Sequence, residues 1–435
     1  MDARTRNFAD VRAAMQRYVD QDILPGVSWT VLRGRDLVDQ QCVGWADREA
    51  GTALRPDHIF RAFSNTKIFV TCAIMLLMEQ GRIGLDDVVE KFLPQLGNRQ
   101  VLKAGAADLA DVEPARSSIT IRQLLTHTSG LSYGLFDPGS VIFKAYNEAR
   151  VLNPLTPLPD LIDKLAGLPL SYHPGTSWEY SVATDVLGRV VEVVSGQALD
   201  AFFKAHIYDP LGMTDTGFFV PESEQGRLVA YYRGADVLDP MKPGLFRNDD
   251  KPYPQAYRRP FPRLSGGGGL VTTMPDMFAL VRALLPGSDT LLKPDTIEQM
   301  MRNQLPDGQN HSFRHPRCYS GQGLWTRRRC HLRADADRSV ELRRGIPVGR
   351  CGRYALVDLP AGQYGRRLDG AARNGVLESV LFRVQAPRLR RRGRALSEAD
   401  ALFTKGDVGL SPAPSSSGRT HSFRRRFPCR MSMVL

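Results

Sequence analysis

The sequence has few cysteines and no hydrophobic stretch long enough to span a membrane. Its longest apolar run, residues 68–78, falls well short of the roughly 20 residues that a bilayer requires. Residues 1–8 lack the apolar core of a secretory signal peptide. The six cysteines show neither zinc-ligand nor redox-pair spacing: Cys42, Cys72, Cys318, Cys330, Cys351 and Cys429. These absences favour a cytoplasmic protein with free thiols, and they imply no metal, cofactor or membrane partner.

Lysine is almost missing from the last quarter of the chain. Residues 326–435 contain 23 Arg and one Lys against nine acidic residues, a net charge of +15, whereas the first 325 residues carry −3. One interpretation is a nucleic-acid-binding tail. The region lacks a stacking platform of aromatic residues and a binding fold, so we expect no nucleic-acid partner. The abrupt change in composition indicates that two different polypeptides are joined near Trp325.

Before Trp325 the composition is that of an ordinary globular protein, and 435 residues suffice for one large or two modest domains. Periodicity predicts an amphipathic helix, two strands joined by a turn, a long apolar helix, a mostly helical region, and a glycine run that leads into a final helix. In order, these are residues 8–20, 27–32, 37–45, 64–81, 82–255, 266–269 and a helix that ends at residue 285.

Ser64 and Lys67 form the first candidate for chemistry. Ser64 lies where a loop enters the apolar helix, and a spacing of three residues places Lys67 on the same helix face. A hydroxyl becomes a nucleophile when a base takes its proton, and a lysine can be that base when burial and nearby cations lower its pKa. The helix N-terminus also directs backbone N–H groups at a developing oxyanion. The motif is short, however, and an N-cap serine followed by a surface lysine gives the same pattern.

Tyr180 is the second candidate, in residues 173–181, where it follows Pro174-Gly175. A tyrosine beside a lysine ammonium ionises more easily, and it can then pass a proton to a leaving group. The alternative is a half-buried core ring, which is the common environment of a tyrosine.

Five segments, in matching order and spacing, resemble the penicillin-binding, class C β-lactamase-like superfamily of serine hydrolases. They are residues 63–67 with the following apolar helix, residues 124–131 (LLTHTSGL), residues 174–181, residues 210–218, and the glycines of residues 266–269 with Leu270 and Thr273. The resemblance covers about residues 8–325. It implies an α/β fold, in which an antiparallel sheet flanked by helices comes from residues 1–81 and 256–325. A mostly helical domain, residues 82–255, is inserted, and the active site lies between the two.

By position, the resemblance makes Ser64 the acylated nucleophile, Lys67 its base, and Tyr180 the partner that serves the leaving group and water. His127 is, by the same resemblance, a structural residue of a loop. Val182 stands where class C β-lactamases usually carry an asparagine that holds the β-lactam side chain. The sequence therefore favours an esterase or acyltransferase acting on small-molecule esters or amides. A β-lactamase or D,D-peptidase, and a catalytically dead binding protein, are the alternatives.

The third motif of this family is missing after Gly269. This motif, Lys-Thr-Gly in β-lactamases and often Trp-Gly-Gly or His-x-Gly in esterases, supplies an oxyanion N–H and one wall of the site. When residues 340–351 are back-translated and read one base later, allowed codons give a peptide that ends in Trp-Gly-Gly. The neighbouring segments give strands and a closing helix in the same frame. We therefore interpret residues 326–435 as an Arg-rich, out-of-frame and largely disordered tail; a genuine Arg-rich extension is the alternative.

Such a tail predicts an incomplete sheet. The family's sheet combines two N-terminal strands with three C-terminal ones. An Arg-rich segment with little apolar periodicity cannot bury enough surface to offset its ordering entropy. We expect residues 326–435 to supply no strand, and the chain as it stands to be inactive or nearly so.

Overall fold

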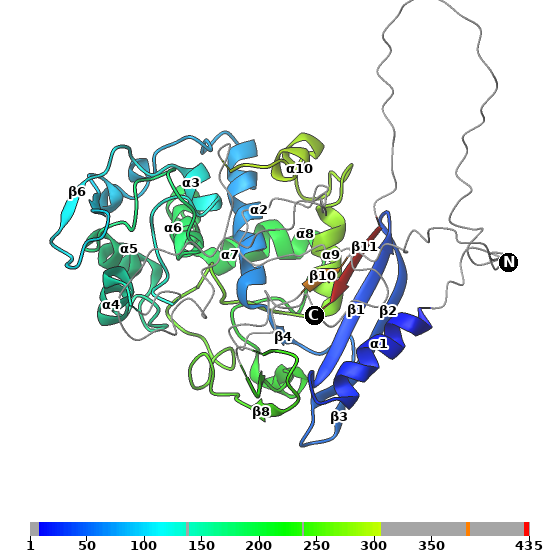
Figure 1. The fold of residues 1–435 in the computed structure, drawn as a ribbon. Helices are drawn as coiled ribbons and strands as arrows, with labels where there is room; N and C mark the ends of the chain where they lie inside the picture. Colours follow the sequence, from blue (N-terminus) through cyan, green and yellow to red (C-terminus); the bar gives the residue numbers. More distant parts are fainter. Residues whose placement is uncertain (1–7, 136–138, 237–238, 306–379, 383–429, 435) are drawn as a thin grey trace, which may run out of the picture.

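The structure, a computed structural model, describes residues 8–135, 139–236 and 239–305, and the backbone alone of residues 380–382 and 430–434. In Figure 1 the sheet and α1 lie at one end, α2 runs through the middle, and α3 to α6 gather at the other end. The strands are β1 (Gly26–Arg33), β2 (Asp36–Asp47), β3 (Thr52–Ala53), β4 (Phe60–Arg61), β5 (Gln100–Leu102), β6 (Val112–Pro114), β7 (Tyr232–Gly234), β8 (Leu245–Arg247), β9 (Val271–Thr272), β10 (Val380–Phe382) and β11 (Arg430–Val434). The helices are α1 (Ala9–Asp20), α2 (Thr66–Glu79), α3 (Ile121–Leu125), α4 (Val141–Glu148), α5 (Leu158–Ala166), α6 (Ala183–Ser195), α7 (Leu199–Phe203), α8 (Asp209–Leu211), α9 (Met274–Ala283) and α10 (Pro294–Met300). Short helical turns are η1 (Phe63–Asn65), η2 (Val89–Lys91), η3 (Pro94–Leu96), η4 (Lys204–Tyr208) and η5 (Glu222–Arg227).

The first helix and the first two strands form as predicted. β1 and β2 pair in an antiparallel hairpin, and its turn contains Gly34 in a left-handed conformation that glycine adopts without steric cost (φ 61°). Val11, Met15 and Val19 recur every four residues, so they share one face of α1. That face packs against the buried Trp29 of β1.

β11 extends the sheet beyond β1, in the order β10-β11-β1-β2-β3. The antiparallel register runs from Trp29 opposite Val434 to Arg33 opposite Arg430. The prediction that residues 326–435 supply no strand is therefore wrong for these two segments. The outer edge of β1 presents N–H and C=O groups that any extended segment can pair with, and residues 431–434 contain no arginine. The disorder predicted for the rest of this tail falls on residues that lie outside the described part of the chain.

α2 is the central helix of the molecule, and it is buried almost all round. Eleven of its residues are buried, including Lys67, and only the last turn reaches the surface. It packs against α6 and α7, which explains why its sequence is apolar on every face rather than amphipathic. It ends as predicted before Gly81, whose φ of 71° closes the helix, with the N–H of Arg82 bonded to the carbonyl of Leu77.

A short ladder joins the two parts of the sequence that carry the candidate site. Phe60 of β4 pairs with Thr272 of β9, and the N–H of Ala62 donates to the carbonyl of Leu270. These bonds place the start of α2 beside the glycine run of residues 266–269. The bounds of the inserted helical domain stay a prediction.

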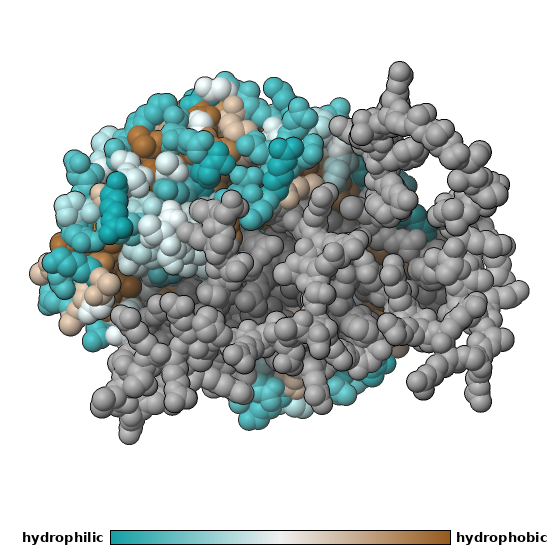
Figure 2. Space-filling view, turned by 45° about the horizontal axis from the view of Figure 1, so that its top comes forward, coloured by the Kyte–Doolittle hydropathy of each residue, from teal (hydrophilic) through white to brown (hydrophobic). Residues whose placement is uncertain are grey.

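The surface of the described residues carries hydrophobic side chains in separate small patches, as Figure 2 shows for one face. The largest exposed examples are Leu155, Phe246 and Leu135, at 61%, 55% and 51% of their full accessibility. Scattered exposed residues of this kind are normal for a globular protein. Within the described ranges, no helix combines the length and apolarity needed to cross a membrane.

Candidate active site

Ser64 lies in the turn η1, directly before α2, on a strained piece of backbone. The preceding residue, Phe63, has a φ of 42°, which is rare for an aromatic residue. Its ring packs against Tyr231 and Tyr257, with centroids 5.6 and 6.0 Å away. These ring contacts hold the turn that presents Ser64, which is only 8% exposed.

The structure brings together all three residues that the sequence selected. The Oγ of Ser64 lies 2.5 Å from the Oη of Tyr180, and either hydroxyl can donate this hydrogen bond. The Nζ of Lys67 donates to the same Oγ at 3.2 Å. Tyr180 is 116 residues away in sequence, so the tertiary fold alone creates this contact. Both a nitrogen and a phenol are thus within proton-transfer distance of one serine hydroxyl.

Lys67 is held from several sides inside the molecule, with 2% of its surface exposed. Its Nζ donates to the carbonyl of Gly267 at 2.5 Å. It also lies 4.7 Å from the centre of the Tyr180 ring and 5.6 Å from that of Tyr133. The fixed amine therefore points at Ser64 and does not act as a surface charge, which removes the alternative interpretation of the serine–lysine pair.

His127 contacts both the ring of Tyr180 and the residue that follows it, Ser181. Its Nδ1 accepts the backbone N–H of Ser181 at 3.2 Å, and it lies 3.0 Å from the Oγ of Ser181. The imidazole ring packs on the ring of Tyr180, with centroids 5.3 Å apart. Burial, aided by the charge of Lys67, holds the pKa of His127 well below its usual range. The histidine is therefore neutral with its proton on Nε2, and it positions the segment that carries Tyr180.

Tyr133 is a residue of the site that the sequence analysis did not select. Its ring stacks on that of Tyr180, with centroids 5.2 Å apart and planes 26° from parallel. Burial raises the pKa of Tyr133, although the charge of Lys67 and a hydrogen bond with it act in the opposite direction. Tyr133 is thus a neutral phenol in contact with the lysine. Only its nearness to Gly130 in the 124–131 motif could have drawn attention to it.

The glycine run of residues 266–269 forms the opposite wall of the site. A side chain at Gly267 would collide with the carboxylate of Asp185 and the hydroxyl of Tyr133, since a Cβ there would lie 2.5 and 2.7 Å away. The hydroxyl of Tyr257 donates to the carbonyl of Gly268 at 2.8 Å, and the N–H of Leu270 donates to Thr66 at 3.1 Å. The sequence selected these glycines by resemblance, but it did not reveal that one of their carbonyls receives the bond from the lysine.

A hollow of about 430 Å³ adjoins this group on the side of Tyr133. Its lining is mixed, with Asn147 and Arg150 beside Leu152 and Leu155. A volume of this size has room for a small organic group. Ser64, Lys67 and Tyr180 do not line this hollow, so it adjoins the group only through Tyr133.

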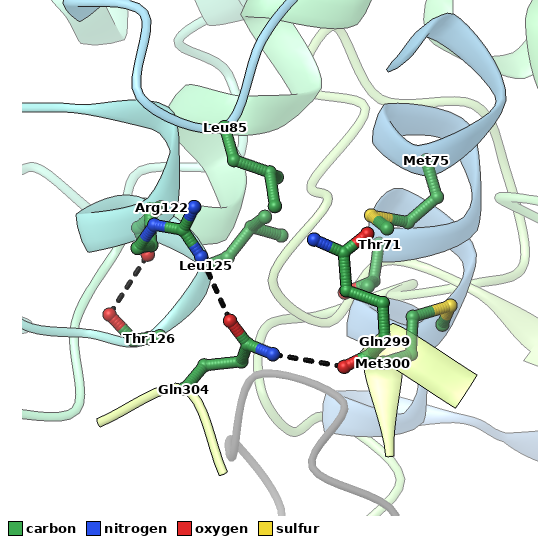
Figure 3. A pocket seen from close by; sticks show the side chains of 9 residues that line it. All are labelled: Thr71, Met75, Leu85, Arg122, Leu125, Thr126, Gln299, Met300 and Gln304. Atoms are coloured by element: carbon green, nitrogen blue, oxygen red, sulfur yellow. Dashed lines mark hydrogen bonds between the residues drawn. The ribbon is translucent and has the colours of Figure 1, made fainter. Parts of the chain in front are cut away.

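A second cavity lies further along α2 and is much smaller, about 40 Å³. Figure 3 shows it between α2, α3 and the segment that ends in Gln304, which accepts a hydrogen bond from Arg122 at 2.9 Å. Thr71 and Met75 of α2 line it, and none of the three predicted site residues does. Its volume suits a few water molecules rather than a substrate.

Val182 lies directly after Ser181 at the start of α6, and its side chain is fully buried in the main hydrophobic core. The position that was expected to separate β-lactamases from esterases therefore presents no polar group to the site. Among the residues that the structure describes, no cluster of His, Cys, Asp or Glu could hold a metal ion.

In this structure an antiparallel sheet lies beside a buried helix, and the candidate nucleophile Ser64 directly precedes that helix. This is the architecture of the β-lactamase and transpeptidase fold. Residues 11–329 match the family described as Beta-lactamase, and the chain belongs to that family. Esterase EstB of Burkholderia gladioli is 32% identical over 68% of this chain and 74% of its own length. Protein Rv1367c of Mycobacterium tuberculosis is 34% identical over 73% of this chain and 78% of its own. The solved structure titled "EstCE1, a hydrolase with promiscuous acyltransferase activity" is 27% identical, covers 68% of this chain and 77% of its own, and superposes with a TM-score of 0.58.

These comparisons support the fold predicted from the sequence, an α/β protein of the β-lactamase and transpeptidase type. They also support the esterase branch of the serine hydrolase superfamily, and hydrolase or acyltransferase activity on small molecules.

Proposed function

We propose that this protein transfers an acyl group from a small ester to water or another acceptor, through an acyl intermediate on Ser64. The observation that carries the proposal is the convergence of two proton-handling groups on one hydroxyl: Lys67 at 3.2 Å and Tyr180 at 2.5 Å. A serine hydroxyl needs such a base to become a nucleophile. No cofactor or metal takes part in the proposed chemistry.

In the first half of the reaction, the Oγ of Ser64 attacks the ester carbonyl carbon while the amine of Lys67 takes the hydroxyl proton. The negative charge that develops on the carbonyl oxygen lies near the start of η1 and α2, where helix N–H groups stabilise an anion. The bond to the leaving oxygen then breaks. Tyr180 gives that oxygen a proton and regains one from Lys67, so the alcohol leaves neutral.

In the second half, the acceptor attacks the acyl carbon and Ser64 leaves as its hydroxyl. Tyr180 first passes its own proton to the amine of Lys67, and the resulting phenolate takes the proton of the attacking water or alcohol. The ammonium of Lys67 then gives its proton to the leaving Oγ of Ser64. The product is a carboxylic acid when water attacks and a new ester when an alcohol attacks. The chain then has the same protonation state as before.

Small esters are the proposed substrates. The buried Val182 leaves no amide to hold a β-lactam side chain. EstB is named as an esterase, and EstCE1 as a hydrolase with promiscuous acyltransferase activity, which supports ester substrates for this chain. A β-lactamase or D,D-peptidase is the second candidate within the family, and the neutral apolar position at Val182 argues against it.

We also infer that the gene is shifted out of frame after about residue 325, so that the third motif is lost from the chain. The family match ends at residue 329, close to the point where the composition changes. Ser64, Lys67 and Tyr180 all precede this point. The chain should therefore still acylate at Ser64, but slowly, because it lacks the oxyanion donor and wall that the restored frame would supply.

The proposal is tested by mixing the protein with a short-chain p-nitrophenyl ester, quenching, and measuring the intact mass. We expect an increase of one acyl group, located on Ser64, in the chain as it stands and faster in the frame-restored chain. An added alcohol should divert the acyl group to a new ester. A frame-restored chain that forms no acyl-enzyme and releases no p-nitrophenol would instead identify a catalytically dead binding protein.

A further inference from the structure

Asp185 is a buried carboxylate next to the site, and the chemistry proposed above gives it no role. It lies in the first turn of α6, five residues after Tyr180, and it is only 2% exposed. Burying a carboxylate is costly unless it is well paired. Its hydrogen bonds therefore need a structural or functional explanation.

Both hydrogen bonds to Asp185 come from the loop that carries the glycine run. The hydroxyl of Ser265 donates to its Oδ1 at 2.7 Å, and the N–H of Gly267 donates to the same oxygen at 3.3 Å. The carbonyl of Gly267 in turn accepts the bond from Lys67 at 2.5 Å. The backbone of Gly267 thus connects the two groups: its N–H binds the carboxylate of Asp185, and its carbonyl binds the amine of Lys67.

Charged and polar groups surround Asp185 from several elements. Arg263 lies in the same loop and is buried, and burial lowers its pKa while the charge of Asp185 partly restores it. Its guanidinium donates to the carbonyls of Thr156 and Val151 at 2.8 and 2.7 Å. Tyr133 contacts Lys67, and the negative charge of Asp185 contributes to the raised pKa of this tyrosine. The negative charge of Asp185 thus raises the pKa of both Arg263 and Tyr133, and its direct hydrogen bonds go to Ser265 and Gly267.

We propose that Asp185 is a positioning residue for acylation: it holds the loop of residues 263–269 so that the Gly267 carbonyl meets Lys67 and fixes the amine against Ser64. This inference rests on the proposed function, because it assigns Asp185 a role through the base. Without the carboxylate, the loop would lose two anchors and the amine would lose its fixed direction. Misplacing a reacting group by about 1 Å costs on the order of 100-fold in rate.

Asp276 provides a matched control elsewhere in the fold. It too lies in the first turn of a helix, α9, and is 5% exposed. It likewise accepts a hydroxyl and a backbone N–H, from Thr216 at 2.7 Å and Asp215 at 2.9 Å. Its variants should lose stability much as those of Asp185 do, but they should leave the rate at Ser64 almost unchanged.

The test measures the rate at which a fluorophosphonate labels Ser64 in the full chain, per folded molecule and across pH. We expect Asp185→Ala to slow labelling by about 10- to 100-fold, while Asp276→Ala stays within about twofold of the parent. Asp185→Asn keeps an oxygen that can accept both bonds, so it should retain most of the rate. It also removes a negative charge near Lys67, so the midpoint of its pH profile should move to lower pH.

Several outcomes would overturn the inference. Labelling of Asp185→Ala at the parent's rate, or an equal loss in Asp185→Asn and Asp276→Asn with no change of pH midpoint, would reduce Asp185 to a structural residue. If Asp185→Ala does not fold, Ser265→Ala and the pH profile of Asp185→Asn decide in its place. A parent chain whose Ser64 is never labelled, or whose labelling survives Ser64→Ala, overturns the proposed function and this inference together. Normal Ser64 labelling with an unaffected Asp185→Ala overturns this inference alone.

Discussion

At the scale of single residues, the site depends on side chains that burial fixes in one orientation. Ser64, Lys67 and Tyr180 could be selected from the sequence because a three-residue spacing places two of them on one face and a family resemblance supplies the third. Tyr133 and Asp185 could not be selected. Their contacts with Lys67 and Gly267 arise only when segments that are far apart in sequence come together in the fold. No local pattern encodes such contacts.

Replacing Lys67 with arginine tests its role as a base. Arg keeps the positive charge, but a guanidinium does not give up its proton near neutral pH. We expect acylation to slow by about 100- to 10,000-fold, the usual contribution of a general base. The measurement is the pre-steady-state burst of p-nitrophenol. Lys91→Arg, an exposed lysine on η2, is the control and should behave as the parent does; near-normal bursts in Lys67→Arg would contradict the assignment.

His127 predicts a specific dependence of stability on pH. Its pKa is held low in the folded protein, so below about pH 6.5 the unfolded chain takes up a proton that the folded chain does not. The free energy of unfolding should therefore fall as the pH drops below 6.5, by up to about 1.4 kcal/mol per pH unit for this residue. Denaturant unfolding of the parent and of His127→Gln between pH 5 and 8 measures how the free energy of unfolding changes with pH in each protein. Equal slopes in both proteins would show that His127 is not the cause; the remaining slope in the variant includes His58, whose pKa burial also lowers.

Val182 predicts the choice between ester and β-lactam. Because this side chain lies in the core and offers no amide to the site, turnover of short-chain p-nitrophenyl esters should exceed turnover of nitrocefin. Parallel assays with the frame-restored chain measure the ratio. Equal turnover of nitrocefin and the best ester would favour the β-lactamase alternative.

At the scale of elements, the sequence predicted the type and order of most helices and strands near the site. The hydrophobic periodicity and the turn residues predicted α1, the β1–β2 hairpin and the end of α2, because these elements depend on local sequence patterns. The short β4–β9 ladder was not predicted, since two-residue strands have no period to detect. The pairing of β11 with β1 was missed because composition describes an average, and a few residues without arginine suffice to extend an edge strand.

Thr66 links two of these elements, and its replacement by valine tests the link. Its hydroxyl accepts the N–H of the fully buried Leu270, which would be left without a partner. A buried unsatisfied N–H costs about 1–3 kcal/mol, so Thr66→Val should lower the free energy of unfolding by that amount. Thr71→Val, on the same helix, is the control: its hydroxyl only adds a donor to the carbonyl of Lys67, and we expect a loss below about 1 kcal/mol. Denaturant unfolding of both variants gives the comparison, and equal losses would contradict the link.

At the scale of the whole molecule, the first 305 residues contain the complete serine–lysine–tyrosine group, while the excess charge lies beyond residue 325. Composition located the excess charge, whereas the motifs and the family resemblance placed Ser64, Lys67 and Tyr180 before it. The C-terminal tail could not be foreseen in detail, because an Arg-rich segment offers few apolar positions from which to derive a packing arrangement.

Limited proteolysis tests the inferred change of frame. An Arg-rich segment that does not pack is open to trypsin, so the chain should lose residues beyond about 325 early while the preceding part resists. The frame-restored chain should resist over its whole length and hydrolyse esters faster. A chain that resists trypsin throughout and matches the restored chain in activity would show that residues 326–435 form a genuine domain.

The central claim is that Ser64 is the nucleophile, and site-resolved probe labelling tests it most directly. The chain and its frame-restored form are treated with a fluorophosphonate, digested with trypsin, and analysed by mass spectrometry for the peptide of residues 62–67. We predict that the probe adds to Ser64 in both proteins, faster in the restored one, and that Ser64→Ala abolishes the labelling. Labelling that persists in Ser64→Ala, or a restored chain whose Ser64 stays unmodified, would contradict the account.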